Sequence, residues 1–146
     1  MDRGLAVILM AFTGGLIAMQ APINAGLGKS TGSIAAAFVS FGVGTILLAL
    51  IMVVAGQAGG ISAAFDVRWY YLLGGVLGAA YVFSALTAVS SIGAGAVAAA
   101  TITGQLTLSV VLDRVGFLGL EQQAFTAPRV LGIVLLLAGT FLVVKY

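Results

Sequence analysis

Cysteine and histidine are both missing from the 146-residue sequence, and charged residues make up only 7% of it. The missing side chains exclude disulfides, thiol redox pairs, histidine-based catalytic triads and imidazole or thiolate metal sites. A soluble domain carries about 25% charged residues, whereas 62% of this chain is hydrophobic. The composition therefore predicts an integral membrane protein, and it excludes a disordered chain for the same reason.

Six basic and four acidic residues divide the chain into long apolar runs. The runs cover about residues 4–26, 33–56, 69–90, 93–112 and 128–144. Each is long enough for a tilted helix to cross a bilayer, which needs roughly 20 apolar residues. We therefore predict an all-α polytopic membrane protein in which residues 1–146 form a single transmembrane domain of five helices. A flexible loop is expected at 56–60, and a tight turn is expected at 90–93.

The distribution of charge indicates how these helices insert. Five crossings place the two termini on opposite sides of the membrane. The arginines fall on the N-terminal side and the lysines on the other: Arg3, Arg68, Arg114 and Arg129 against Lys29 and Lys145. The positive-inside rule favours a cytoplasmic N-terminus, but so small a bias also permits insertion in both orientations.

Small residues recur at helical spacing within the runs, where they let helices pack closely. The glycines predicted to serve this packing are Gly44, Gly74, Gly78, Gly132 and Gly139. Polar residues share helix faces in the same way. Gln20 and Asn24 lie four residues apart, as do Thr101 and Gln105, and Ser40 belongs to the small-residue stripe of the second run.

Amide side chains inside hydrocarbon are costly unless they are hydrogen-bonded. Gln20, Asn24 and Gln105 therefore need partners, and two interpretations remain open: they line a solvated or substrate-facing cavity, or they form a dry structural network. Tyr81 likewise either faces a cavity or packs between helices. Pro22 removes a helical hydrogen bond beside two of these amides. It predicts either a kink or helix end of the kind found at transporter binding sites or simply the point where the chain leaves the membrane.

No acidic or basic residue is predicted at mid-membrane depth. Intramembrane carboxylates usually mark proton relays and cation sites, so proton exchange through a membrane glutamate is disfavoured. Three charges are predicted to lie at one membrane interface, namely Asp113, Arg114 and Arg129. They either anchor the helices and pair with one another or form a gate on that side.

The sequence contains no motif that supports an enzymatic function. Residues 93–98 match a dinucleotide-binding fingerprint, but they lack the strand–turn–helix context that the fingerprint requires. No nucleophile can be paired with a base from the residue types present. The sequence therefore predicts no enzyme activity, no cofactor, no metal site and no nucleic-acid partner.

The chain resembles the YdcZ family of the drug/metabolite transporter superfamily over nearly its whole length. The segments that carry the resemblance are 20–28 (QAPINAGLG), 40–45 (SFGVGT), 69–82 (WYYLLGGVLGAAYV), 104–116 (GQLTLSVVLDRVG) and 129–132 (RVLG), together with Gly139. The resemblance implies a multi-pass inner-membrane exporter of five helices, equivalent to half of an EamA-like inverted-repeat transporter. It does not imply the cation/proton exchange of four-helix multidrug transporters, because their helix-one glutamate has no counterpart here.

These inferences favour a transporter or exporter of a small organic solute that acts in the bilayer as a homodimer. A second copy inserted upside down would supply the inverted repeat and place the substrate near the midplane, so an antiparallel dimer is expected. The predicted cavity lining is Gln20, Asn24, Ser40, Tyr81, Thr101 and Gln105. Without a buried acid, a neutral or zwitterionic solute fits better than a dication. A passive channel and a non-transporting subunit of a larger complex remain alternatives.

Overall fold

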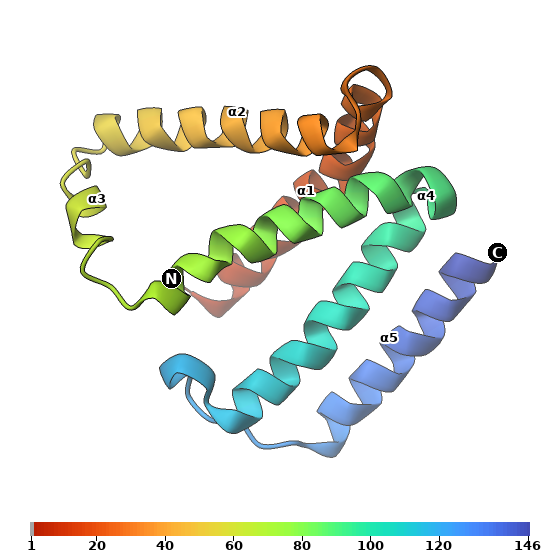
Figure 1. Ribbon diagram of the computed structural model, residues 1–146. Coiled ribbons are helices and arrows are strands. Elements are labelled where there is room, and N and C mark those ends of the chain that lie inside the picture. Colours follow the sequence, from red (N-terminus) through yellow and green to blue (C-terminus); the bar gives the residue numbers. More distant parts are fainter. Residues whose placement is uncertain (1) are drawn as a thin grey trace. The chain divides into compact units, whose positions relative to one another are not determined.

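The computed structural model describes residues 2–146, which form helices and short connections with no strand among them (Figure 1). The elements are α1 (Arg3–Thr31), α2 (Ser33–Val54), α3 (Gly60–Ala63), the 3₁₀ turn η1 (Trp69–Leu72), α4 (Leu73–Val115), the 3₁₀ turn η2 (Phe117–Gly119) and α5 (Ala127–Lys145). Within this described part, four helical stretches are long and apolar enough to cross a bilayer. The predicted class, an all-α polytopic membrane protein, is confirmed.

α1 is longer than the sequence predicted. Asp2 caps its N-terminus, where the carboxylate accepts hydrogen bonds from two backbone amides at 3.0 and 3.4 Å, as N-cap residues do. The helix passes through Pro22 and ends at Thr31, beyond the boundary expected near residue 26. Proline removes one helical hydrogen bond, but the surrounding turns continue the helix on both sides. The helix therefore does not end at Pro22.

Two glycines break helices in nearly the same backbone conformation. Gly32 (φ 82°, ψ 153°) is the single residue between α1 and α2. Gly93 (φ 79°, ψ 161°) interrupts α4 and separates helical segments 73–92 and 94–115. This region of backbone space is essentially restricted to glycine. The turn expected at 90–93 is thus made by one residue, and the loop expected at 56–60 leads directly into α3.

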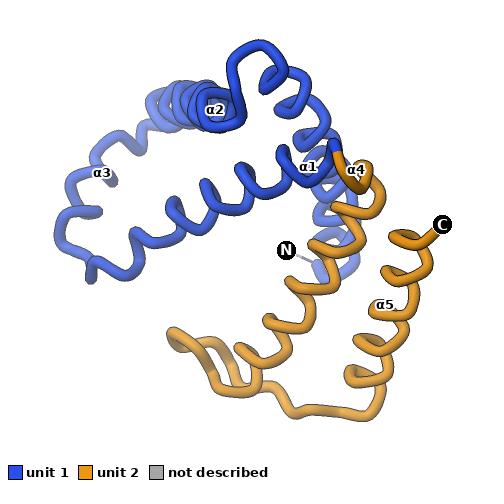
Figure 2. The backbone as a smooth tube through the Cα atoms, turned by 45° about the vertical axis from the view of Figure 1, so that its right-hand side comes forward, with its two compact units in different colours: residues 1–90 blue, residues 91–146 orange. Residues whose placement is uncertain are grey.

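Residues 1–90 form the first of two compact units (Figure 2). Here α1 packs against α2, and the helices approach closely at Gly28, where an added Cβ would lie 3.7 Å from the Cβ of Ala36. Ala36, Val82 and Leu86 make a small buried core that joins α2 to α4. Partly buried side chains surround this core, namely Leu27, Ala37 and Tyr81.

Residues 91–146 form the second unit, in which α5 lies beside the 94–115 segment of α4 (Figure 2). A Cβ added at Gly95 would lie 4.0 Å from Val143 Cγ1. Farther along α4, the hydroxyls of Thr103 and Thr140 are 2.5 Å apart. Partners farther along α4 lie earlier along α5, so the two helices are antiparallel.

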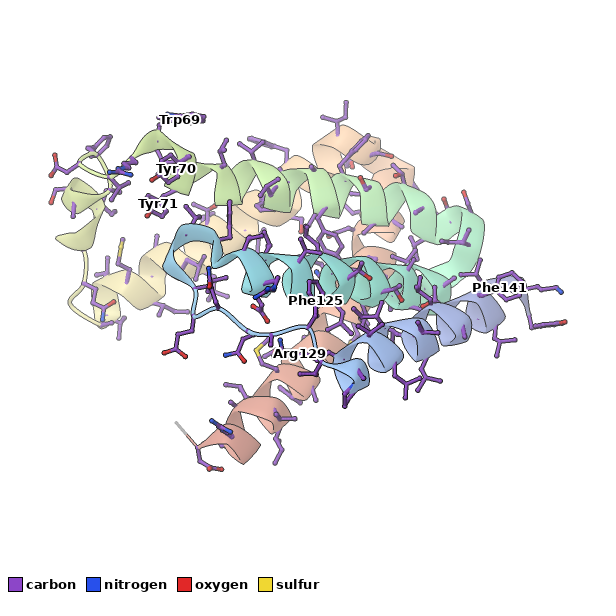
Figure 3. All side chains as sticks on the ribbon, turned by 90° about the horizontal axis from the view of Figure 1, so that it is seen from below. Trp69, Tyr70, Tyr71, Phe125, Arg129 and Phe141 are labelled. Carbon is purple, nitrogen blue, oxygen red and sulfur yellow. The ribbon has the colours of Figure 1, made fainter. Side chains whose placement is uncertain are left out.

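Large apolar side chains project from the helices of the chain (Figure 3). Phe38 is 79% exposed and Val54 is 88% exposed. In water, such extensive apolar surface would promote aggregation. Around a membrane protein it faces lipid or another helix, so the exposure agrees with the bilayer environment predicted from composition.

Candidate solute-binding site

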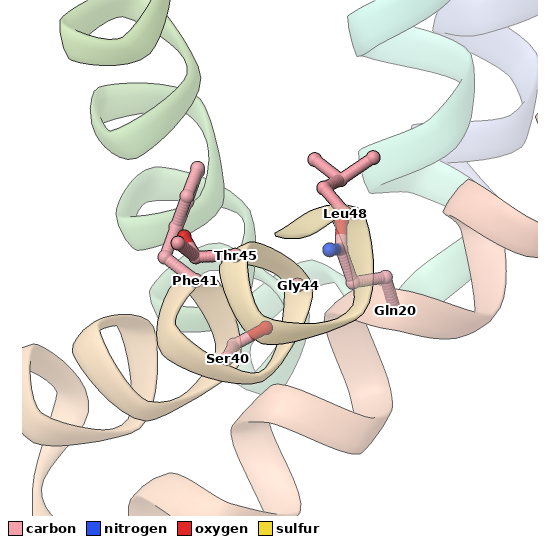
Figure 4. Close-up of a pocket in the computed structure, with 6 residues that line it drawn as sticks. All are labelled: Gln20, Ser40, Phe41, Gly44, Thr45 and Leu48. Atoms are coloured by element: carbon pink, nitrogen blue, oxygen red, sulfur yellow. The ribbon is translucent and has the colours of Figure 1, made fainter. Parts of the chain in front are cut away.

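A pocket of about 200 Å³ lies along the contact between α1 and α2 (Figure 4). The lining residues are Gln20, Ser40, Phe41, Gly44, Thr45 and Leu48. Gln20 comes from α1, and the other five come from little more than two turns of α2. Because residues three and four apart share a helix face, these side chains form one surface. It combines uncharged hydrogen-bonding groups with an aromatic ring and an aliphatic side chain.

The register of α1 and α2 aligns the polar residues of one helix with the small residues of the other. Gly28 lies against Ala36 near the connecting turn. Asn24 is one helical turn farther from that connection, on the same face of α1 as Gly28. Gln20, another turn away, lines the pocket. The two helices therefore meet at Gly28 and Ala36 and again around the pocket that Gln20 lines.

Asn24 and Tyr81 occupy different surroundings from the pocket residues. Asn24 is only 5% exposed, and its Nδ2 atom has no hydrogen-bond partner. Tyr81 packs against the apolar core described above. Gly78 supports the pocket from α4, because an added Cβ there would lie 3.5 Å from Cζ of Phe41. The Phe41 ring therefore connects the pocket to α4, and Phe41 was not among the residues predicted to line a cavity.

The remaining predicted lining residues, Thr101 and Gln105, belong to residues 91–146. Thr101 is half-buried and Gln105 is exposed. At 3.6 residues per turn, both lie about 160° around α4 from Thr103, which contacts α5. They therefore share a face that is turned away from α5. The structure brings Gln20 and Ser40 together in one pocket, while Thr101 and Gln105 form a separate pair on the second unit.

In the second unit, Thr103 and Thr140 form a hydroxyl network that was not predicted from the sequence. The hydroxyl oxygens of Thr103 and Thr140 lie within hydrogen-bond distance of each other and of the carbonyl of Ala99, at 2.9 and 3.1 Å from the carbonyl oxygen. Because each hydroxyl has one proton, one threonine donates to the carbonyl while the other donates to its partner hydroxyl. Thr107 adds a hydrogen bond to the carbonyl of Thr103 at 2.8 Å. The four-residue spacing of Ala99, Thr103 and Thr107 was the available signal, since it marks one helix face.

Asp113, near the end of α4, and Arg129, near the start of α5, form an ion pair. Arg129 Nη1 lies 3.7 Å from Asp113 Oδ2, with both side chains about one-third exposed. Nη1 has no hydrogen-bond partner, so the contact is an ion pair without a hydrogen bond. Such partly exposed pairs contribute about 0–1 kcal/mol. Arg114 has no carboxylate within 4.0 Å among residues 2–146. A gating role for these three charges stays a prediction.

The glycines predicted to pack helices fall into two groups. Gly44 and Gly78 lie at the pocket, as described above. An added Cβ would meet no atom within 4 Å at Gly74, Gly132 or Gly139. Gly44 likewise has no atom within 4 Å of an added Cβ, so a helix-packing role for these four glycines stays a prediction.

Long apolar helices, outward-facing apolar side chains and a pocket without charged groups define a polytopic helical membrane protein. The family model described as "Putative inner membrane exporter, YdcZ" matches residues 5–142. The chain therefore belongs to the YdcZ family, as the segments quoted from its sequence predicted, and it is a multi-pass inner-membrane protein.

Comparison with curated proteins shows similarity to "Inner membrane protein YdcZ" of Escherichia coli (strain K12), with 31% identity over 90 residues. The aligned stretch covers 62% of this chain and 60% of that protein, so it spans less than two thirds of the relative's length. No solved structure matches the chain.

Proposed function

We propose that this protein exports a small organic solute and that the solute's path includes the pocket between α1 and α2. The observation that carries the proposal is the cluster of uncharged polar groups on Gln20, Ser40 and Thr45 between helices that are otherwise apolar. Amides and hydroxyls away from water require hydrogen-bond partners, which a polar solute supplies. The exporter description of the matching family model supports the same function.

The volume and lining of the pocket also indicate what kind of solute fits it. A volume of about 200 Å³ corresponds to roughly seven water molecules at about 30 Å³ each. No charged side chain lines this volume, so a dication would have no fixed counterion there. We therefore expect a small neutral or zwitterionic solute.

A flux screen in proteoliposomes tests the proposal. Neutral, zwitterionic, cationic and anionic solutes are offered with and without a pH gradient. We expect saturable flux of a neutral or zwitterionic solute, and a roughly three- to tenfold lower kcat/KM in Gln20→Ala, as the loss of one neutral hydrogen bond predicts. Gln57→Ala, which removes the same side chain from the loop before α3, serves as the matched control and should transport normally.

Other outcomes of the screen contradict the proposal in distinct ways. Flux that does not saturate indicates a passive channel. Preferential saturable transport of a dication contradicts the assigned solute class. No flux of any solute, with the chain folded and inserted, indicates a non-transporting subunit.

We further propose that two copies form the transporter as an antiparallel homodimer. If segments 73–92 and 94–115 each cross the membrane, the chain has five crossings, and a second copy must be inverted to complete an inverted repeat. Gln105 is exposed in the single chain, and an amide in hydrocarbon needs a covering partner. The open glycines Gly132 and Gly139 permit close approach of another helix.

Reporter fusions at Tyr146 test this dimer. Dual insertion predicts that the C-terminal reporter is found on both faces of the membrane in comparable amounts. Replacing Lys29 and Lys145 with alanine, which strengthens the charge asymmetry, should bias the reporter to one face and lower flux. A wild-type reporter confined to one face would contradict antiparallel assembly of identical chains.

A further inference from the structure

Asn24 differs from the other buried polar side chain of the chain. Among residues 2–146, Asn24 and Thr103 are the buried polar residues, at 5% and 7% exposure. The Thr103 hydroxyl is hydrogen-bonded to Thr140 and to the carbonyl of Ala99. Asn24 Nδ2 has no hydrogen-bond partner. Buried donors in folded proteins are nearly always paired, so this amide needs an acceptor.

Asn24 is outside the pocket lining, but it lies on α1 between the pocket residue Gln20 and the close helix contact at Gly28. On one side, the contact between Gly28 and Ala36 brings the two helices close together. On the other side, Gln20 lines the pocket, facing the same volume as Ser40 (Figure 4). Asn24 lies four residues from both Gln20 and Gly28, so it shares their helix face.

Hydroxyl groups near this seam are also free to bind another molecule. Of the four threonines in residues 2–90, three donate to carbonyls of their own helix at 3.0 Å, namely Thr13, Thr31 and Thr87. Thr45, which lines the pocket, has no side-chain hydrogen bond within the described chain, and neither does Ser40. The pocket therefore contains two hydroxyls that are available to a bound molecule.

We propose that Asn24 selects solutes that carry a carbonyl or carboxylate oxygen, to which its side-chain N–H donates while the Ser40 hydroxyl supplies a second donor. This inference rests on the proposed transport function of the pocket. A neutral amide recognises an oxygen acceptor without needing a net negative charge on the solute. A cation that lacks a carbonyl or carboxylate would leave Nδ2 unpaired, so it should be rejected.

Because Asn24 is the only asparagine in the sequence, isotope labelling isolates its side chain. We suggest labelling the full chain with ¹⁵N-asparagine and titrating it in lipid nanodiscs with glycine betaine, which carries a carboxylate, and with acetamide, which carries a carbonyl. Choline keeps the trimethylammonium group of betaine but has neither oxygen group. We expect the single side-chain NH₂ resonance to shift saturably with at least one of the first two probes and not with choline. An unchanged resonance with both, or an equal shift with choline, overturns the proposal.

Substitution of Asn24 separates recognition from a structural role. Asn24→Leu keeps the approximate volume and removes an unpaired buried donor, so its thermal stability should equal or exceed that of the wild type. Its kcat/KM for the transported solute should fall by about tenfold or more, and Asn24→Ser, which retains a donor, should recover part of that loss. A lower unfolding temperature in Asn24→Leu with normal transport indicates a structural hydrogen bond and contradicts recognition.

Different results would overturn the role of Asn24 and the transport function of the pocket. If Gln20→Ala impairs flux while Asn24→Leu transports normally, the pocket remains the transport site and only the role of Asn24 is overturned. If the wild-type chain moves no solute in the flux screen, the proposed transport function itself fails.

Discussion

Replacing Gly44 with leucine is expected to abolish transport while leaving the protein folded. Gly44 lines the pocket, and an added Cβ there would meet no atom within 4 Å. A leucine side chain therefore enters open space and does not collide with the neighbouring helix. It fills volume that the solute needs, so flux should fall below detection. Proteoliposome flux and thermal unfolding should be measured on the same preparation.

Gly42→Leu is the matched control for this substitution. Gly42 lies on α2 two residues earlier, an added Cβ there also meets no atom within 4 Å, and the residue is outside the pocket lining. Positions 42 and 44 are about 160° apart around the helix. A leucine at position 42 therefore points away from the side of α2 on which Gly44 lies. We expect substantially retained flux in Gly42→Leu. Equal losses in the two variants would show that bulk on α2, and not occupation of the pocket, causes the defect.

Replacing Gly93 with alanine is expected to cause the largest loss of stability of any single methyl addition in α4. At φ 79° and ψ 161°, a Cβ conflicts with the backbone, which costs about 1–3 kcal/mol. The substitution also makes an uninterrupted helix through 73–115 more favourable, because alanine is a better helix former than glycine. Reversible unfolding in mixed micelles, followed by circular dichroism, should show the lower free energy of unfolding.

Gly104→Ala tests whether the effect comes from the conformation at position 93. Gly104 lies in the 94–115 segment with ordinary helical geometry and no atom within 4 Å of an added Cβ. Alanine there should be neutral or stabilise the helix by up to about 1 kcal/mol. D-alanine at position 93, introduced by semisynthesis, should restore stability because its mirror-image preference fits a positive φ. Equal effects of L-alanine at 93 and 104 would contradict a glycine-dependent break.

The sequence predicts the helical elements well where hydropathy and charge agree. The apolar run at 33–56 and α2 (Ser33–Val54) nearly coincide, since glycine precedes the run and polar loop residues follow it. The first run was ended too early, because Gly26, Gly28 and Lys29 suggest an interface. The structure shows that α1 continues until Gly32 adopts a conformation that no other residue adopts readily. A backbone dihedral of this kind is not visible in composition.

The candidate site is only partly predictable, for a physical reason. Amides stand out in an apolar chain because they must find partners, so Gln20 and Asn24 were selected from the sequence. Phe41, Thr45 and Leu48 resemble dozens of lipid-facing residues until α1 and α4 are placed around α2. Similarly, Thr103 is distinguished from Thr101 only by its position opposite α5. Partner choice between helices depends on packing, which hydropathy does not encode.

Cysteine accessibility tests most directly whether the seam between α1 and α2 admits water and solute. The native chain has no cysteine, so Ser40→Cys introduces a single, nearly isosteric thiol in the pocket. Phe38→Cys is the control, since Phe38 is 79% exposed and lies about 160° around α2 from Ser40. We predict that a membrane-impermeant thiosulfonate modifies the thiol at position 40, that the transported solute slows this reaction, and that the thiol at position 38 stays unmodified in lipid. Equal resistance of both thiols to the reagent would contradict a solute path between these helices.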